Sequence, residues 1–120
     1  MTDEDAWRIE ESLWKGSPLE FADRVSASCL MAFADPVGVI SGTEAAEGIN
    51  ELERWEMVDM SAKQLARPAD DLVILAYRAE GQRDLAPTYR AYCTSTYHRS
   101  AGGRWLLVQH QQTPIGRRSR

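Results

Sequence analysis

The chain has 120 residues, of which 43% are hydrophobic and 27% are charged, and this composition is typical of one globular domain spanning residues 1–120. The formal net charge of −4 argues against a nucleic-acid partner, because neutralising phosphates needs a clustered basic surface. The one basic cluster falls within residues 115–120, which we expect to form a flexible basic tail.

Membrane, metal and redox roles are also disfavoured. No stretch approaches the ~20 apolar residues needed to cross a membrane, and no apolar run of signal-peptide type follows the acidic N-terminus. Cys29 and Cys93 form no Cys-x-x-Cys pair, and the histidines and carboxylates match none of the common metal-ligand spacings. We therefore expect a cytoplasmic protein with free thiols, no metal and no cofactor.

Two short helices are predicted before the first strand. Thr2 is a suitable N-cap for a helix over residues 2–14, and the acidic residues after it suit the positive end of the helix dipole. Apolar side chains recur along this helix, with Glu10 between them, at Ala6, Ile9, Leu13 and Trp14. Gly16 is placed to end this helix, and a Ser-Pro pair begins a second one that covers residues 17–25.

A strand, a turn and a third helix follow. Residues 28–34 form an apolar run of strand length, which the Asp-Pro-Val-Gly turn at residues 35–38 ends. Residues 39–40 give a brief second strand. Thr43 is the expected N-cap of a third helix. The apolar side chains of this helix fall at Ala46, Ile49, Leu52 and as far as Trp55.

From residue 55 onward, a period of two favours strands. We expect strands over residues 55–65 and 72–82, separated by a turn at residues 68–71. Two arms of about ten residues, on either side of a Ser-Ala-Gly-Gly turn, predict a β-hairpin over residues 89–114. Helices before antiparallel strands are the order of an α+β domain, with helices packed on one face of a curved sheet.

The element order and two short stretches resemble the nuclear transport factor 2-like superfamily, which includes SnoaL-like domains and ketosteroid isomerases. Phe-Ala-Asp-Pro-Val-Gly at residues 33–38, with Ser-Gly-Thr-Glu-Ala at residues 41–45, resembles the isomerase segment that bears the general-base aspartate. Gly-Gly-Arg-Trp-Leu-Leu-Val-Gln-His-Gln-Gln-Thr-Pro at residues 102–114 resembles the Gly-(Lys/Arg)-Trp … His ending of SnoaL-like proteins. The resemblance implies a cone-shaped, curved antiparallel sheet wrapped around the N-terminal helices, in the order α-α-β-β-α-β-β-β-β.

Asp35 is the first candidate catalytic residue. In the isomerases the matching aspartate moves a proton between carbons, while a tyrosine and a protonated aspartic acid stabilise the oxyanion. The aligned positions here hold Ser95 in place of that acid and Ile9 near that tyrosine, so the resemblance carries over the base without its partners. The alternative is that Asp35 forms a turn before proline and caps the local backbone.

His110 is the second candidate catalytic residue. It alternates with Val108 and Gln112 on one face of the last predicted strand, while Leu107 falls on the other face. The isomerase register, taken from the resemblance, points His110 and its two neighbours into the cone. Opposite them on the preceding strand are Cys93, Ser95 and Tyr97. A serine hydrolase is disfavoured because no nucleophile elbow is present, and the alternative is a hydrogen-bonded structural histidine.

Aromatic side chains complete the predicted pocket. Trp14, Trp55 and Tyr77 would give the cone an apolar lining with a few polar groups, which is typical of a small-molecule site. The alternative is that most of these residues are ordinary core. Polar and aromatic residues on the opposite, outer face are compatible with a homodimer that packs there. They are Arg90, Tyr92, Thr94 and Thr96.

Three functions remain open from the sequence. The first is a domain that binds an unidentified small molecule in an enclosed pocket, with weak acid–base catalysis by Asp35 and His110. The second is a non-catalytic dimerisation or association module. The third is an isomerase or dehydratase of steroid- or polyketide-like compounds, which the missing oxyanion partners disfavour. Fold cannot decide among them, because one scaffold hosts many activities.

Overall fold

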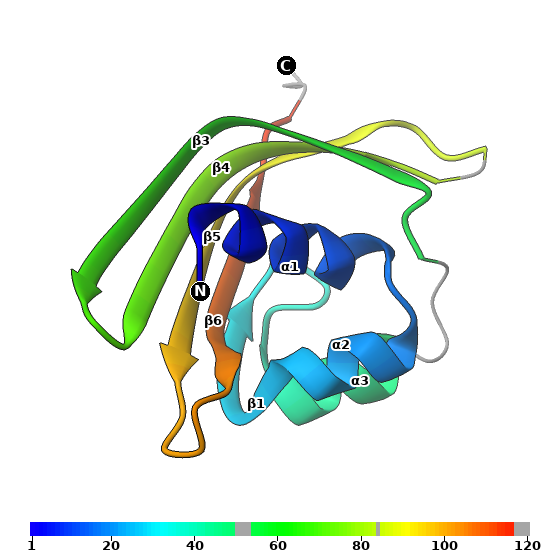
Figure 1. Ribbon diagram of the computed structural model, residues 1–120. Helices are drawn as coiled ribbons and strands as arrows, with labels where there is room; N and C mark the ends of the chain where they lie inside the picture. The colour runs from blue at the N-terminus through cyan, green and yellow to red at the C-terminus, as the bar shows by residue number, and fades with distance from the viewer. Residues whose placement is uncertain (50–53, 84, 117–120) are drawn as a thin grey trace.

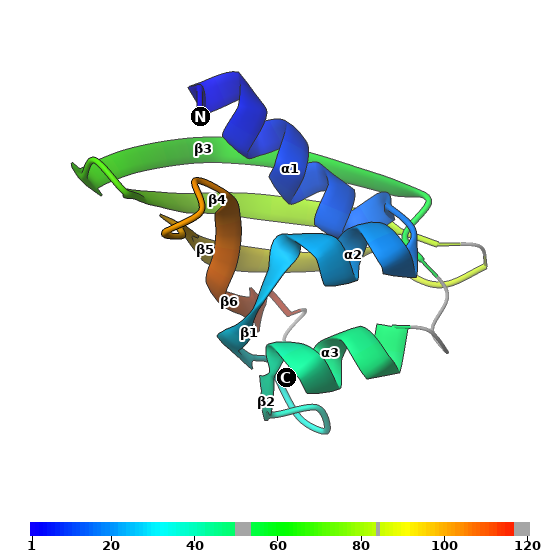
Figure 2. The same cartoon turned by 60° about the horizontal axis from the view of Figure 1, so that its bottom comes forward.

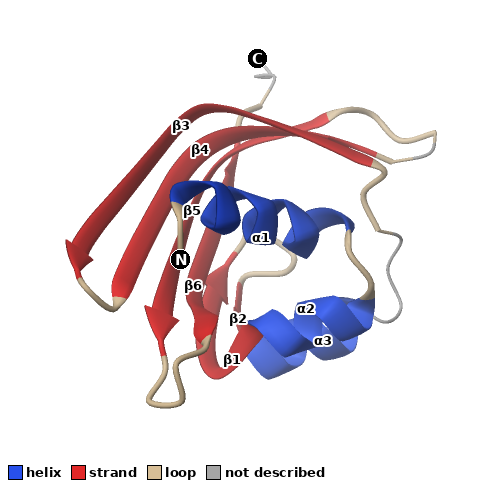
Figure 3. Ribbon diagram, viewed as in Figure 1, coloured by secondary structure: helices blue, strands red, loops and turns tan. Residues whose placement is uncertain are grey.

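The computed structural model describes residues 1–49, 54–83 and 85–116, and it confirms the α+β class and the order of elements (Figure 3). The elements are α1 (Asp3–Lys15), α2 (Pro18–Arg24), β1 (Val25–Ala32), β2 (Val39–Ser41), α3 (Gly42–Ile49), β3 (Met57–Ala69), β4 (Leu72–Gln82), β5 (Tyr89–Arg99) and β6 (Trp105–Pro114). Leu52 and most of the expected basic tail lie outside the described residues.

Local capping explains where the helices begin. At α1 the Thr2 hydroxyl accepts a hydrogen bond from the Asp5 N–H, and the Asp5 carboxylate accepts one from the Thr2 N–H, as the sequence predicted for the cap. The cap of α3 differs from the prediction, because Ser41 and not Thr43 fills it. Ser41 exchanges the same pair of hydrogen bonds with Glu44, since the acidic residue must lie three positions after the cap.

The described strands form one six-stranded sheet in the order β2-β1-β6-β5-β4-β3. Neighbouring strands that are consecutive in the sequence pair antiparallel. By contrast, β1 pairs with β6 in parallel, with Leu30 opposite Gln109. The sheet is therefore mixed: the antiparallel arrangement that the resemblance implied holds for every described strand pair except β1 with β6. The reason is that β1 and β6 are far apart in the chain, so no tight turn fixes their relative direction.

Two strand boundaries also differ from the prediction. β1 begins at Val25, and β3 starts after Trp55 and continues through Pro68, so the turn shrinks to Asp70–Asp71. Proline is tolerated in β3 because β3 is an edge strand, where an N–H is not needed on the open side. The β3–β4 register shifts near Ala62, whose φ of 52° marks a bulge that helps to bend the sheet.

The sheet curves around α1, which lies across its concave face (Figure 1). Figure 2 shows α1 beside β3 and α3 beside β1 and β2, with α2 between them. The core fills the space between α1 and the central strands. Leu13 and Trp14 belong to the same buried cluster as Leu75 and Tyr77, and the Trp14 indole donates a hydrogen bond to the Tyr77 hydroxyl. No helix among the described residues is long and apolar enough to cross a membrane.

Candidate functional site

A cavity of about 620 Å³ lies between the helices and the β1–β6 side of the sheet. Most of its lining is apolar, from Leu13, Trp14, Phe21, Met31, Phe33, Ile40, Ile49, Trp55 and Leu107. Its polar lining consists of Asp35, Glu44, Arg54, Arg83, Tyr89, His110 and Gln112. Residues 34–37 of the β1–β2 turn are exposed and line it as well, so the cavity opens to solvent on this side.

His110 occupies the sheet wall of this cavity. It lies opposite Ser95 in the β5–β6 ladder and is 7% exposed. Its Nδ1 is 2.7 Å from the Ser95 hydroxyl, and its ring lies 5.9 Å from that of Phe33 on the cavity side. The imidazole is therefore held by the protein interior at one nitrogen while it lines the apolar cavity.

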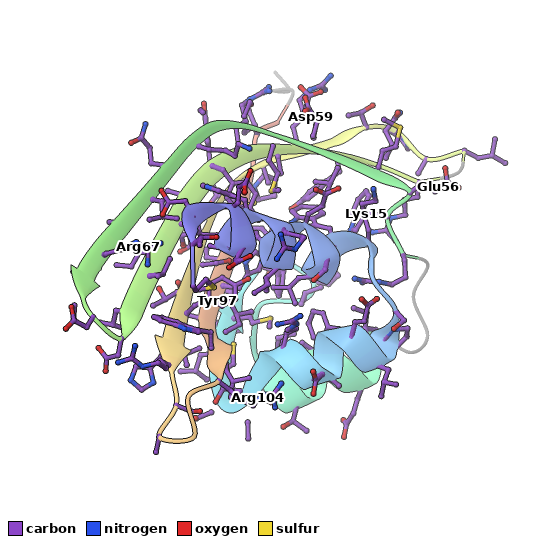
Figure 4. The ribbon with its side chains drawn as sticks, in the orientation of Figure 1. Lys15, Glu56, Asp59, Arg67, Tyr97 and Arg104 are labelled. Atoms are coloured by element: carbon purple, nitrogen blue, oxygen red, sulfur yellow. The ribbon has the colours of Figure 1, made fainter. Side chains whose placement is uncertain are left out.

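Glu10 is the residue that sequence reasoning missed. It lies on α1, is fully buried, and its carboxylate accepts hydrogen bonds from the hydroxyls of Tyr77, Ser95 and Tyr97. Figure 4 shows Tyr97 on β5 beneath α1. A signal was present, because Glu10 follows Ala6 by four positions and therefore falls within the buried stripe of the helix. Such a burial is tolerated only when the charge is hydrogen-bonded.

A chain of hydrogen bonds connects Gln112 in the cavity lining to the buried Glu10, and each group donates to the next one along the chain. The Gln112 side-chain nitrogen lies 3.0 Å from His110 Nε2, and the Gln112 oxygen accepts from the Tyr89 hydroxyl at 2.9 Å. Because Nε2 accepts from Gln112, the neutral ring of His110 carries its proton on Nδ1 and donates to Ser95. Ser95 in turn donates to Glu10 at 2.6 Å.

Burial sets the protonation of the groups in this network. It lowers the pKa of His110, although the Glu10 carboxylate, 3.6 Å from Nδ1, acts in the opposite direction. Burial and the Glu10 charge raise the pKa of both Tyr77 and Tyr97 well above the usual value, and burial raises that of Tyr89 to about 12. The tyrosines are therefore neutral donors, and His110 is a neutral imidazole at neutral pH.

The predicted pocket residues divide into two groups. Trp14, Trp55 and Gln112 line the cavity, as do Asp35 and His110. The others lie on the same concave face, buried beside α1 and behind the cavity wall. They are Tyr77, Cys93, Ser95 and Tyr97.

Val108 is the exception, because it does not line the cavity. The β5–β6 register shifts there: Thr96 pairs with Gln109, but the next residue, Tyr97, pairs with Leu107. This bulge breaks the period of two, so Leu107 faces inward in place of Val108. The assignment of Val108 to the inner face assumed an unbroken alternation.

Asp35 lies at the exposed rim of the cavity, in the turn between β1 and β2. Within the described part of the chain its carboxylate has no hydrogen bond or ion pair. The turn is closed by main-chain bonds from the N–H groups of Val37 and Gly38 to the Ala34 carbonyl. The alternative in which the Asp35 side chain caps the local backbone is therefore not what the structure contains.

The cysteines are buried and free, and they take no part in the cavity lining. Burial raises the pKa of Cys29 to about 11 and that of Cys93 to about 12, which leaves both as unreactive thiols. The described residues contain no cluster of three or more histidine, cysteine or acidic side chains that could hold a metal ion.

Trp55 forms the wall at another side of the cavity, together with two arginines. Its ring stacks on Tyr89 at 5.5 Å and packs closely over Gly81, where any Cβ would approach the indole to 2.9 Å. The Arg83 guanidinium lies 3.9 Å above the same indole. Arg54 donates hydrogen bonds to carbonyls at the C-terminal end of α1. Sequence reasoning did not single out either arginine.

No family model and no curated protein matches this sequence. Several solved structures do match its fold. A protein from Parabacteroides distasonis that is provisionally called a ketosteroid isomerase has a TM-score of 0.80 and 18% identity, over 96% of this chain and 89% of that chain. An NTF2-like protein of unknown function in nutrient uptake from Rhodospirillum rubrum has a TM-score of 0.73 and 22% identity, over 92% and 94%. The association domain of C. elegans CaMKII has a TM-score of 0.74 and 15% identity, over 92% and 90%.

These likenesses establish the fold. The chain has the nuclear transport factor 2-like fold, in the form shared with ketosteroid isomerase-like proteins, as its element order and its two short stretches indicated. The matched structures include both an isomerase-like protein and an association domain, so the fold is compatible with binding and with association.

Proposed function

We propose that this chain binds a small organic molecule in the cavity and moves a proton on it through His110. The observation that carries the proposal is the placement of one imidazole on an apolar cavity wall, with its Nδ1 bonded to Ser95 and through it to the buried Glu10. An apolar pocket with a few converging polar groups is the usual form of a small-molecule site.

The proton would move to or from Nε2, the ring nitrogen that faces Gln112. The electron pair of Nε2 accepts from the Gln112 amide, and it becomes available as a base when a ligand displaces that amide. The lowered pKa of His110 keeps the ring neutral at neutral pH. When Nε2 takes a proton, the resulting imidazolium lies 3.6 Å from the Glu10 carboxylate, which stabilises the positive charge. Rotation of the Gln112 amide would then offer its oxygen to the new N–H.

Asp35 is the competing base. Its carboxylate lines the cavity at the rim, at the position that resembles the isomerase base. The position of the isomerase acid holds Ser95, whose hydroxyl donates to Glu10. The Ser95 hydroxyl is therefore engaged away from any ligand in the cavity and does not replace the isomerase acid. This favours His110 as the base over Asp35 acting in a steroid or polyketide isomerase.

A generic proton-abstraction probe tests the two bases directly. When a base removes the carbon-bound proton of nitrobenzisoxazole, the N–O bond breaks, a nitrile forms and a coloured phenolate is released. We expect catalysis by the wild type that His110→Gln reduces by roughly 100-fold, while Asp35→Asn retains it. The rate should rise with pH through a midpoint below 6.5, the ordinary pKa of histidine.

The opposite pattern would contradict this assignment. If Asp35→Asn abolished the reaction and His110→Gln did not, Asp35 would be the base. A wild-type rate no higher than that of free imidazole would remove the catalytic part of the proposal. Circular dichroism of each variant serves as the control for folding.

Self-association through the convex sheet face is the second candidate. Ile74 is 36% exposed and Tyr92 57% exposed on that face, with Thr94, Thr96 and Gln109 hydrogen-bonded to one another beside them. One of the matched structures is an association domain. We expect a dimer in sedimentation experiments that Ile74→Lys dissociates. A monomeric wild type at all concentrations would rule this candidate out.

A further inference from the structure

Ser95 lies between two groups that can each hold a proton. Its hydroxyl oxygen is 2.7 Å from His110 Nδ1, and it donates to Glu10 Oε2 at 2.6 Å. Both distances are those of well-formed hydrogen bonds. A hydroxyl carries one proton and two electron pairs, so it can receive a proton on one side while it gives up its own on the other. Ser95 is therefore placed to pass a proton between the imidazole and the carboxylate.

The other end of this chain of hydrogen bonds reaches the cavity. His110 Nε2 lies 3.0 Å from the Gln112 side-chain nitrogen, and the Gln112 oxygen accepts from the Tyr89 hydroxyl at 2.9 Å. His110 and Gln112 line the cavity, whereas Ser95 and Glu10 are fully buried behind its wall. A proton that a ligand gives to Nε2 therefore enters a chain that continues into the protein interior.

The chain can reverse its direction while each group in it keeps a partner. With a proton on Oε2, Glu10 donates to Ser95, and the Ser95 hydroxyl donates to Nδ1 of the imidazole. His110 then carries its proton on Nε2 and donates to the Gln112 oxygen, once that amide has rotated. The Gln112 nitrogen in turn donates to the Tyr89 hydroxyl oxygen. Both directions therefore satisfy the buried polar groups, as a native interior requires.

The burial of Glu10 decides where the proton comes to rest. In water an imidazole holds a proton more tightly than a carboxylate does, by about two pKa units. In the interior, however, a protonated His110 and an ionised Glu10 are two buried charges, and transfer of the proton removes both. Tyr77 and Tyr97 keep their hydrogen bonds to Glu10 after the transfer, because the oxygens of a neutral carboxyl group still accept. The neutral pair therefore carries the smaller cost of burial.

Other titratable and charged groups lie on the elements packed against this chain. Tyr77 on β4 and both Cys93 and Tyr97 on β5 stay neutral, because burial raises the pKa of each. The charge of Arg24, at the end of α2, opposes that rise at Tyr97. Four charged residues share the cavity with the imidazole, and they are Asp35, Glu44, Arg54 and Arg83. Within the chain itself, a proton taken up near neutral pH therefore goes to the imidazole or to the buried carboxylate.

We propose that Ser95 relays to Glu10 the proton that His110 takes from a ligand, so that the ring stays neutral and changes its tautomer. This inference rests on the proposed proton-transfer function, and it adds the fate of the proton. As the ligand's bond to hydrogen breaks, an Nε2–H bond forms. The Nδ1–H bond then breaks, its proton joins the Ser95 oxygen, and the original Ser95 proton passes to Glu10 Oε2. The positive charge gained by the ring thereby cancels the negative charge of Glu10.

The relay gives the cavity a second use of the same ring. After the transfer, Nε2 carries a proton and faces the ligand, so the ring can return a proton to a different atom. Ser95 and Glu10 act through His110 and do not touch the ligand, so they are positioning residues rather than catalytic ones. Such an arrangement suits a reaction that removes a proton at one atom and adds one at another.

Nitrogen NMR of histidine-labelled protein tests the relay without any ligand. A ring protonated at Nδ1 alone, at Nε2 alone, or at both nitrogens gives three different spectra. As the pH is lowered below 6.5, we expect wild-type His110 to pass from the Nδ1 form to the Nε2 form. In Ser95→Ala the hydroxyl is absent, and the same titration should produce an imidazolium. A wild-type ring that becomes an imidazolium would overturn the relay, whether or not Ser95→Ala folds.

Tyr97→Phe is the matched control for Ser95→Ala. It also removes one hydroxyl that donates to Glu10, but it leaves Ser95 between the carboxylate and the imidazole. We expect the change of tautomer to persist in this variant and to occur at a higher pH, because the carboxylate has lost a donor. The higher pH also separates the titration from acid unfolding. An imidazolium in Tyr97→Phe, or the Nε2 form in a folded Ser95→Ala, would show that the hydroxyl of Ser95 is not the path.

The outcome is separable from that of the proposed function, which the turnover of nitrobenzisoxazole measures. If His110→Gln abolishes turnover but the protonated wild type contains an imidazolium, His110 remains the base and the relay is wrong. If the wild-type ring changes its tautomer but His110→Gln retains full turnover, the proton path to Glu10 is supported and the proposed function fails. Circular dichroism of each variant reports whether it is folded.

Discussion

Glu10 is the residue on which the interior of this molecule depends most. Its carboxylate is fully buried and receives hydrogen bonds from three hydroxyl groups on β4 and β5. Neutral glutamine has the same shape but would direct N–H groups toward hydroxyls that are themselves donors. We therefore expect Glu10→Gln to lower the free energy of unfolding by about 3 kcal/mol, measured by urea denaturation.

Glu11→Gln is the matched control for this prediction. Glu11 is the next residue on α1, is only half-buried, and pairs with Lys15 at the surface. Its substitution should change stability by less than about 0.5 kcal/mol, because surface pairs contribute little. Equal effects of the two substitutions would show that the buried network is not a major source of stability.

The free energy of unfolding should depend on pH through the titration of His110. Its pKa in the folded state is below the ordinary value of 6.5, so between these two pKa values the unfolded chain binds the proton and the folded chain does not. The free energy of unfolding should therefore fall as the pH is lowered from about 6.5 toward the folded pKa, and should be independent of this group above 6.5. His110→Gln should lack this segment of the profile, and a profile identical to that of the wild type would contradict the assignment.

At the scale of elements, the close contact between Gly81 on β4 and Trp55 is sensitive to any substitution that adds a side chain at Gly81. A Cβ at Gly81 would come within 2.9 Å of the indole, so Gly81→Ala must displace the aromatic wall of the cavity. We expect it to cost about 1–3 kcal/mol, as overpacking usually does, and to weaken the binding of N-phenylnaphthylamine, a neutral fluorescent probe, in the cavity. Thermal denaturation and probe titration measure the two effects.

Gly48→Ala on α3 is the counterpart of Gly81→Ala. A Cβ there meets open space, and alanine favours a helix over glycine, so stability should stay equal or rise by up to about 1 kcal/mol. If both substitutions destabilised the protein to the same extent, tight packing of Trp55 over Gly81 would not be the cause.

The elements that the sequence predicted well are those with local signals. The cap at Thr2, the Ser-Pro start of α2 and the run over β4 depend on neighbouring residues alone. The features that it predicted wrongly depend on strand pairing across the chain. The bulge at Val108 arises only when β5 and β6 pair, and the parallel partner of β1 only when strands far apart in the chain align.

At the scale of the whole molecule, the fold could be predicted and the site only in part. The isomerase register, taken from the resemblance, implied that His110 and Ser95 lie opposite each other, and they pair in the β5–β6 ladder. Glu10 reaches Ser95 only because α1 crosses the concave face of the sheet, which joins residues 85 positions apart (Figure 1). Arg83 lies over Trp55 for a similar reason, since residues far apart in the chain converge there.

The central claim, that a neutral His110 with its proton on Nδ1 meets ligands in the cavity, can be measured by nitrogen NMR of histidine-labelled protein. At neutral pH the His110 nitrogens should show the neutral tautomer protonated at Nδ1, and Nε2 should shift when N-phenylnaphthylamine is added. The shift should disappear in Gly48→Leu, which fills the cavity. An imidazolium, a ring protonated at Nε2, or a His110 signal that saturating probe leaves unchanged would contradict the account.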